Sequence, residues 1–221
     1  MGAVFCIVGK SNSGKTTLLE RLIPRLTGRG LSVAAIKHHI HGDFEFDQAG
    51  KDSYRLRRAG ARTVVLSSPK ELVTIRGATA DTPLATLAAA LAVEHDLVLA
   101  EGYKETKGFL KVEVHRQSLG PDLITAPEER LAVVSDGSPV VACPLFSLED
   151  IAGLEALLVE RAQEARKGDG VDIALTMNGE AVSLNPFAQS VIARGVWGML
   201  SALRGVEKVT LATVTVRRKA Q

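Results

Sequence analysis

The sequence predicts an α/β fold with a mainly parallel sheet flanked by helices, plus a small C-terminal ββαβ module. The first observation is that short apolar runs alternate with segments of helical apolar spacing up to about residue 165, an order typical of parallel strands joined by helices. The second is a change of pattern after residue 170, where strict apolar alternation meets an Asn178-Gly179 turn signal that favours a hairpin. We therefore expect one domain over 1–167 and a separate module over 171–221.

The expected elements follow these patterns in order. Apolar runs bounded by turn residues predict strands at 3–8, 31–36, 63–66, 71–76, 97–100, 111–115 and 131–134. Helical spacing and capping residues predict helices after the Gly-rich loop that follows residue 8, at 51–59, at 83–93, and from Ser147 and Asp150 to about Lys167. In the module we expect a hairpin from 171 to 184, a helix starting at Asn185-Pro186 and a last strand at 206–216.

The composition is that of a globular protein. Hydrophobic residues make up 46% of the chain and charged residues 24%, so a core can form. The 27 basic and 25 acidic side chains nearly cancel, which argues against nucleic acid or membrane binding through bulk charge. The longest apolar run, 84–93, is too short for a membrane span. Cys6 and Cys143 form no metal or redox motif, so we expect a cytoplasmic protein.

A complete phosphate-binding motif follows the first expected strand. The pattern G-x-x-x-x-G-K-[ST] is matched between an expected strand and an expected helix, the context that the motif requires. Backbone N–H groups of such a P-loop surround phosphate oxygens, its lysine reaches the β- and γ-phosphates, and its hydroxyl binds Mg²⁺. The sequence thus predicts a P-loop NTPase, with Lys15 as a catalytic candidate. The expected nucleotide-binding residues of the loop are Gly9, Lys10, Ser11, Asn12, Ser13, Gly14, Lys15, Thr16 and Thr17.

An acidic side chain is needed beside the metal ion of a P-loop. Glu101 ends the apolar strand at 97–100, whereas Asp96 begins that strand at the opposite end of the sheet. We therefore expect Glu101 to bind Mg²⁺ together with Thr16 and to take part in catalysis. An ordinary helix-cap or solvent carboxylate is the alternative for Glu101.

Two further questions stay open on the sequence. Asp136 follows a strand and is placed to meet the N–H donors of guanine, but a solvent-exposed turn explains it equally well. The loop after the second strand carries His38, His39 and His41. Since adjacent residues of a strand point to opposite sides, we favour phosphate or nucleotide contact over a metal site, with a purely structural loop as the remaining alternative. The residues of this loop expected to face nucleotide, Mg²⁺ or a phosphate-bearing ligand are Lys37, Asp43, Asp47 and Lys51.

Several longer strings resemble the molybdopterin-guanine dinucleotide biosynthesis adapter (MobB) family. The resemblance covers residues 1 to about 165, and the string that runs into Gly50-Lys51-Asp52-Ser53 is more specific than the P-loop alone. The strings are 9–19, Lys37-His38, 43–55, 59–61 and Glu101-Gly102-Tyr103-Lys104.

The resemblance implies a GTP-binding homodimer that assists a separate guanylyltransferase, which joins GMP to molybdopterin to complete the dinucleotide form of the molybdenum cofactor. It implies at most weak GTP hydrolysis, with GTP and Mg²⁺ as ligands and a molybdopterin-type ligand as a candidate for the 43–55 segment. Two alternatives remain: a metallochaperone-type GTPase that drives metal insertion, supported by the histidines, and a P-loop small-molecule kinase.

The tail after residue 170 and Lys10 of the P-loop each lead to a further expectation about partners. From residue 171 onward the sequence has no Gly-rich loop, acidic pair or histidine, so we expect a partner-docking module there. The alternative is that the tail extends the main sheet or a dimer interface. Lys10 resembles the extra lysine of deviant P-loops in dimeric ATPases, which implies contact with the partner subunit's phosphates. Those loops have glycines where Ser11 and Asn12 stand, so a solvated lysine is the alternative that we favour.

Overall fold

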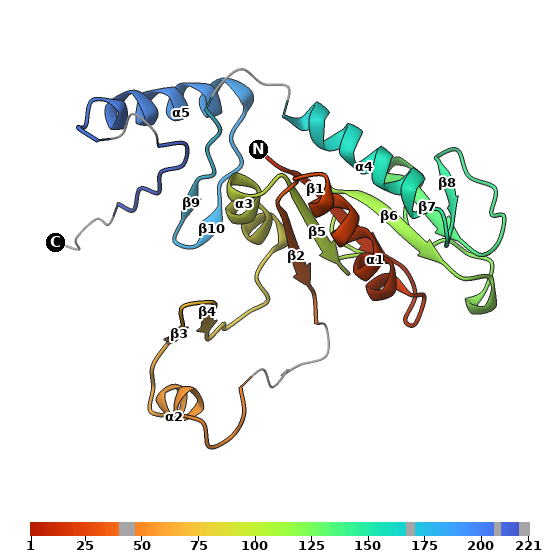
Figure 1. Ribbon diagram of the computed structural model, residues 1–221, viewed down its shortest axis with the longest axis horizontal. Coiled ribbons are helices and arrows are strands. Elements are labelled where there is room, and N and C mark those ends of the chain that lie inside the picture. The colour runs from red at the N-terminus through yellow and green to blue at the C-terminus, as the bar shows by residue number, and fades with distance from the viewer. Residues whose placement is uncertain (40–46, 167–170, 206–208, 217–221) are drawn as a thin grey trace. The chain divides into compact units, whose positions relative to one another are not determined.

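The computed structural model describes residues 1–39, 47–166, 171–205 and 209–216. Its main feature is a six-stranded sheet of parallel strands in the order β2-β5-β1-β6-β7-β8 (Figure 1). Because β1 lies inside the sheet, the loop that leaves it is flanked by the carboxyl ends of β5 and β6. The strands are β1 (Ala3–Val8), β2 (Val33–Lys37), β5 (Leu97–Glu101), β6 (Leu110–His115), β7 (Arg130–Ser135) and β8 (Leu145–Ser147).

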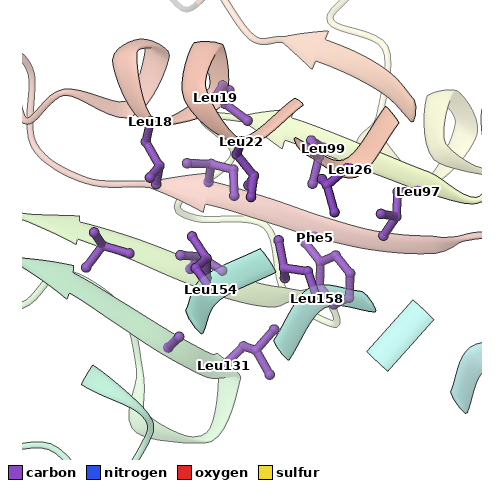
Figure 2. Packing of buried hydrophobic residues seen from close by; sticks show 14 of the residues in the cluster. Phe5, Leu18, Leu19, Leu22, Leu26, Leu97, Leu99, Leu131, Leu154 and Leu158 are labelled. Carbon is purple, nitrogen blue, oxygen red and sulfur yellow. The ribbon is translucent and has the colours of Figure 1, made fainter. Parts of the chain in front are cut away.

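Three helices cover the two faces of this sheet. Helices α1 (Lys15–Gly28) and α4 (Ile151–Ala165) pack on one face, and α3 (Leu84–Glu94) packs on the other. Phe5 faces α1 and α4, as Figure 2 shows, whereas its neighbour Cys6 faces α3, the alternation expected along a strand. β1 is apolar throughout, as expected for a strand covered on both faces, whereas β6 also buries Lys111, Glu113 and His115.

Burial also explains the character of Cys6. Its side chain is fully buried in the cluster under α3, and burial raises the pKa of its thiol to about 11. A thiol that stays protonated at neutral pH is a poor nucleophile and a poor metal ligand. The structure therefore agrees with the interpretation of Cys6 as a core residue.

Helix α4 starts later than the sequence suggested. Ser147 ends β8 instead of capping the helix, and its Oγ accepts the Asp150 N–H at 3.2 Å. Asp150 is the N-cap, because its Oδ1 accepts the Gly153 N–H at 2.9 Å. The short strand β8 was not expected, since its three residues alternate exposed and half-buried positions and give little apolar signal.

Residues His38–Pro83 form a second compact unit. It contains α2 (Asp52–Arg58) and an antiparallel hairpin of β3 (Thr63–Ser67) and β4 (Leu72–Arg76). These three elements were expected, but the two strands pair with each other and not with the main sheet. Only four residues separate them, enough for an antiparallel turn and too few for the crossover that parallel pairing needs.

The tail contains a short hairpin, β9 (Thr176–Met177) and β10 (Glu180–Ala181), followed by α5 (Pro186–Ser201). Asn178 and Gly179 have φ values of 52° and 86°, as a two-residue turn with positive φ at both positions requires. The Ala181 N–H donates to Thr86 Oγ1 of α3 at 3.1 Å. The hairpin therefore lies against α3, and the expected turn signal is confirmed.

The prediction of a last strand at 206–216 is wrong for the residues that the structure describes. Residues 209–216 form no strand, and residues 206–208 lie outside the described part of the chain. The apolar residues of this segment alternate in the sequence, but the described residues offer them no neighbouring strand to pair with. The domain boundary near 167–171 and the docking role of the tail stay predictions.

None of the helices in the described ranges is long and apolar enough to cross a membrane.

Candidate functional site

The P-loop connects β1 to the first turn of α1. An ideal Cβ on Gly9 would lie 2.3 Å from the Val114 carbonyl oxygen of β6 and 2.6 Å from Ser13 Oγ, so a side chain there would displace the backbone. Asn12 and Gly14 have φ values of 61° and 94°, the left-handed conformation that favours these residue types. The loop therefore turns sharply and delivers its backbone N–H groups to the start of α1, where anions bind.

Lys15 lies within this loop. Its Nζ donates to the Gly9 carbonyl at 3.1 Å and to the Lys10 carbonyl at 2.8 Å. Burial lowers the pKa of the Lys15 ammonium, an effect that nearby Glu101 opposes and Lys37 reinforces. A bound phosphate would supply the negative charge that favours the ammonium form.

Glu101 ends β5 with a side chain that is only 6% exposed. Its Oε1 and Oε2 accept hydrogen bonds from Thr16 Oγ1 at 3.1 and 3.0 Å, and Lys37 Nζ forms an ion pair with Oε1. The strand register explains the ion pair, because Lys37 lies directly opposite Glu101 on β2. The structure thus brings Thr16, Lys37 and Glu101 together, and their roles toward nucleotide and Mg²⁺ stay predictions. Hydroxyl and carboxylate oxygens are ligands that Mg²⁺ prefers.

Arg116, which the sequence analysis missed, contacts the P-loop directly. Its Nε donates to the Ser13 carbonyl at 3.1 Å, and its Nη1 lies 3.4 Å from Asp136 Oδ2. Asp136 Oδ1 accepts the Gln117 N–H at 2.8 Å, and this hydrogen bond, assisted by Arg116, lowers the pKa of the Asp136 carboxyl. Arg116 follows β6, the neighbour of β1. Only the strand order, which no local pattern provides, could have pointed to it.

Asp136 lines a pocket of about 490 Å³ formed by residues 135–138 and 145–149. The pocket follows the carboxyl ends of β7 and β8. Ligands of open α/β sheets bind outside this end of the strands. Asp136 itself is exposed although it lines this pocket, and its contact with guanine stays a prediction.

The remaining P-loop residues are mostly accessible. Ser11, Asn12 and Thr17 are exposed, whereas Ser13 is fully buried. Lys10 Nζ donates to the Leu119 carbonyl of its own chain at 2.9 Å. Contact of Lys10 with the phosphates of a partner subunit stays a prediction.

The residues expected from the loop after β2 belong to the second unit, apart from Lys37. Asp47 and Lys51 line a pocket of about 640 Å³ beside α2 and the β3–β4 hairpin, and their contact with nucleotide stays a prediction. His38 Nε2 lies 2.7 Å from Asp81 Oδ2. Among residues whose placement is described, no three His, Cys, Asp or Glu side chains are arranged to share a metal ion. His41 and Asp43 lie outside the described residues.

The site defines the class of protein. P-loop NTPases have a glycine-rich loop between an interior parallel strand and a helix, with a buried carboxylate on the adjacent strand facing the loop. The family model described as molybdopterin guanine dinucleotide synthesis protein B (MobB) matches residues 4–136. The chain belongs to this MobB family.

Three comparisons show the extent of the similarity. The molybdopterin-guanine dinucleotide biosynthesis adapter protein of Escherichia coli (strain K12) is 35% identical over 159 residues, covering 70% of this chain and 90% of that protein. A similarly named relative from Methanocaldococcus jannaschii is 28% identical over 227 residues, covering 92% and 93%. The crystal structure of Bacillus subtilis MobB superimposes with a TM-score of 0.59 at 25% identity, covering 72% of this chain and 97% of that chain. The match to the archaeal relative thus extends into the tail.

Proposed function

We propose that this chain is a GTP-binding adapter that assists a guanylyltransferase in attaching GMP to molybdopterin. The observation that carries the nucleotide-binding part is the placement of Lys15 inside the P-loop beside the Thr16–Glu101 pair. Membership of the MobB family carries the biosynthetic part. The proposal includes a homodimer with at most weak GTP hydrolysis.

Each polar group of the site would have a separate role in binding GTP and Mg²⁺. Lys15 would exchange its two carbonyl partners for phosphate oxygens. Thr16 and Glu101 would hold Mg²⁺, which when bound neutralises phosphate charge and orients the phosphates. Lys37 holds the Glu101 carboxylate in position through their ion pair.

The same contacts favour slow hydrolysis. Both oxygens of Glu101 already accept hydrogen bonds from Thr16, and one of them also pairs with Lys37. With its oxygens occupied in this way, Glu101 has little capacity left to accept a proton from an attacking water. Glu101 therefore suits metal binding better than base catalysis. Slow hydrolysis agrees with an adapter whose role depends on bound GTP and not on its rapid turnover.

The pocket at the ends of β7 and β8 supports a site for the base. Arg116 connects the P-loop carbonyl of Ser13 to Asp136. The Asp136 carboxylate retains lone pairs beyond those that Gln117 and Arg116 occupy. A carboxylate complements the N1–H and 2-amino donors of guanine, a pair that adenine does not present. The arrangement therefore favours GTP over ATP.

Calorimetric titration with GTP, GDP and ATP side by side tests the proposal. We expect GTP to bind the parent chain at least about tenfold more tightly than ATP, because the Asp136 contact is worth one charge-assisted hydrogen bond.

Lys15→Ala should weaken GTP binding by about 100-fold or more, since it removes the charge that meets the phosphates. Arg161→Ala, which removes an exposed cation on α4, is the control and should leave affinity unchanged. Parental GTP affinity in Lys15→Ala would refute the P-loop assignment.

A further inference from the structure

The turn after β6, residues 116–120, contacts both the P-loop and the loop after β7. Arg116 Nε donates to the Ser13 carbonyl at 3.1 Å, and Arg116 Nη1 lies 3.4 Å from Asp136 Oδ2. Asp136 also accepts the Gln117 N–H at 2.8 Å. A guanidinium group offers its N–H donors in one fixed plane, so Arg116 is held by the P-loop and by Asp136 at the same time.

This turn is anchored at its start and at its end. His115, the last residue of β6, is buried, and its Nδ1 lies 2.9 Å from Ser135 Oγ while its Nε2 lies 3.0 Å from the Gly120 carbonyl oxygen. From the P-loop, Lys10 Nζ donates to the Leu119 carbonyl at 2.9 Å. A side chain that extends from an anchored turn can hold its contact group in a defined position.

The atom that Arg116 contacts determines the direction of one N–H group of the P-loop. The Ser13–Gly14 peptide is trans, so the Ser13 carbonyl and the Gly14 N–H point in opposite directions. Arg116 holds this carbonyl, and an ideal Cβ on Gly14 would lie 3.2 Å from Arg116 Nη2. The Gly14 N–H therefore points away from the guanidinium. Successive N–H groups of a P-loop surround the phosphate, so Arg116 orients a phosphate donor that belongs to another residue.

We propose that Arg116 is a positioning residue for phosphate binding, held by Asp136 so that the Gly14 N–H stays directed at the phosphate. The inference rests on nucleotide binding at the P-loop, as proposed above, and adds a connection from the base pocket to that loop. A change at Asp136 then alters phosphate affinity even when the ligand has no base.

Inorganic triphosphate, which has no base, is the probe for this connection. We expect Arg116→Met in the full chain to weaken triphosphate binding by about tenfold in calorimetry, because the loop loses one charge-assisted hydrogen bond. Arg161→Met, which removes an exposed cation of α4, is the matched control and should bind triphosphate as the parent does. Parental affinity in Arg116→Met would overturn the inference.

Asp136→Asn gives a test of sign. Removing a negative charge near the site should strengthen the binding of an anion if charge alone matters. We expect binding of triphosphate to become about threefold weaker instead, because a neutral amide holds Arg116 less firmly. The loss should disappear when Asp136→Asn is combined with Arg116→Met, and Asp122→Asn, another exposed carboxylate, should show no loss. Binding by Asp136→Asn as tight as that of the parent, or tighter, would contradict the proposal.

Arg116→Lys separates position from charge. The lysine keeps the positive charge but lacks the planar fork that reaches Ser13 and Asp136 together. We therefore expect triphosphate binding by Arg116→Lys to remain weak, close to that of Arg116→Met. Full recovery of affinity with lysine would show that Arg116 acts only as a cation.

The ligand-free chain provides a readout that does not depend on binding. The ¹⁵N order parameter of the Gly14 amide should fall in Arg116→Met and in Asp136→Asn, while the urea unfolding midpoint stays near that of the parent. An unchanged order parameter in Arg116→Met would overturn the inference even if the parent binds GTP. Absence of both GTP and triphosphate binding by the parent would refute the proposed function, and the inference with it.

Discussion

Glu101 in the main sheet and Asp47 in the second unit are buried to the same degree and paired very differently. Their side chains are 6% and 7% exposed. Both oxygens of Glu101 accept hydrogen bonds from Thr16, and Lys37 adds an ion pair. Asp47 receives one hydrogen bond, from Ser53, and its Oδ2 forms a long ion pair with Arg57 at 3.9 Å but accepts no hydrogen bond from the described residues. The P-loop carboxylate is thus fully stabilised by its own chain, whereas Asp47 is not.

The difference shows that burial and pairing carry separate information. A fully paired carboxylate such as Glu101 is held in a fixed position, ready to bind a cation that replaces or shares its partners. A carboxylate with fewer hydrogen bonds, such as Asp47, contributes less to the stability of the folded chain. Glu101 should therefore matter for the geometry of the P-loop site, whereas Asp47 should matter less for stability than its burial suggests.

The largest effect is expected at Glu101. Glu101→Gln should slow GTP hydrolysis by about 100-fold, because a neutral amide would hold Mg²⁺, the ion that neutralises the phosphate charge, less well. GTP affinity should change by less than about fivefold, since Lys15 and the loop N–H groups remain. Single-turnover hydrolysis and calorimetry measure the two quantities. Hydrolysis at the parental rate would remove Glu101 from the metal site.

A paired carboxylate far from the P-loop gives a stability test. Glu155 of α4 is 3% exposed and forms ion pairs with Arg25 and Arg29 of α1. Glu155→Gln should lower the free energy of unfolding by about 2 kcal/mol, as expected for lost charge-assisted hydrogen bonds. Urea unfolding at pH 7 measures this loss, and Arg161→Ala on the outer side of α4 is the control.

The same residue predicts the direction of a pH effect. Burial raises the pKa of Glu155, but hydrogen bonds from Arg25 and Arg29 outweigh it, so the pKa lies below the ordinary value of a glutamate. The stabilising contribution is present above about pH 4.5 and is lost as the pH falls through the lowered pKa. Parent and Glu155→Gln should therefore converge in stability on acidification. A difference that persists at low pH would show that packing, not charge, is responsible.

A smaller effect is expected at Asp136. Asp136→Asn should reduce the preference for GTP over ATP by about tenfold, because the amide offers at most one acceptor to the guanine edge. Competition between the two nucleotides measures the ratio. Asp122→Asn, an exposed carboxylate on the loop after β6, provides the control. A preference that stays at the parental value would leave Asp136 a structural partner of Gln117 and Arg116.

The smallest effect is expected for the stability of the ligand-free second unit. Asp47→Ala removes a hydrogen bond to Ser53 and at the same time an unsatisfied buried oxygen. These contributions oppose each other, so the free energy of unfolding should change by less than about 1 kcal/mol. Amide hydrogen exchange on β3 and β4 reports this unit directly. A loss as large as that expected for Glu155→Gln would mean that Asp47 is a structural residue.

Much of the main sheet and the P-loop was predictable because local sequence encodes them. Residues 3–8 are a continuous apolar run, and β1 has the same bounds. The glycine spacing from Gly9 to Gly14 fixes the loop, and Glu101 ends a buried strand. Each of these signals is contained within about ten residues, so no knowledge of the tertiary fold is needed to find them.

What was missed depends on contacts between distant segments. Arg116 is unremarkable until the order of the strands places β6 beside β1. The pairing of β3 with β4 alone, and the absence of a strand over 209–216, depend on which partners are available. Alternating apolar residues make a segment able to form a strand, but a neighbour decides whether it does.

Gly9 has a consequence for how this loop changes during evolution. The atom that excludes a side chain there is the Val114 carbonyl oxygen of β6, which is part of the sheet and not of any ligand. A descendant that no longer bound nucleotide would still be under selection to keep this glycine for as long as it kept the sheet. Exposed Ser11 and Thr17 carry no such restraint, and Lys15 would be free to drift once phosphate was gone. In relatives that have lost nucleotide binding, a retained Gly9 therefore indicates common descent. A retained Lys15 would instead indicate continued phosphate binding.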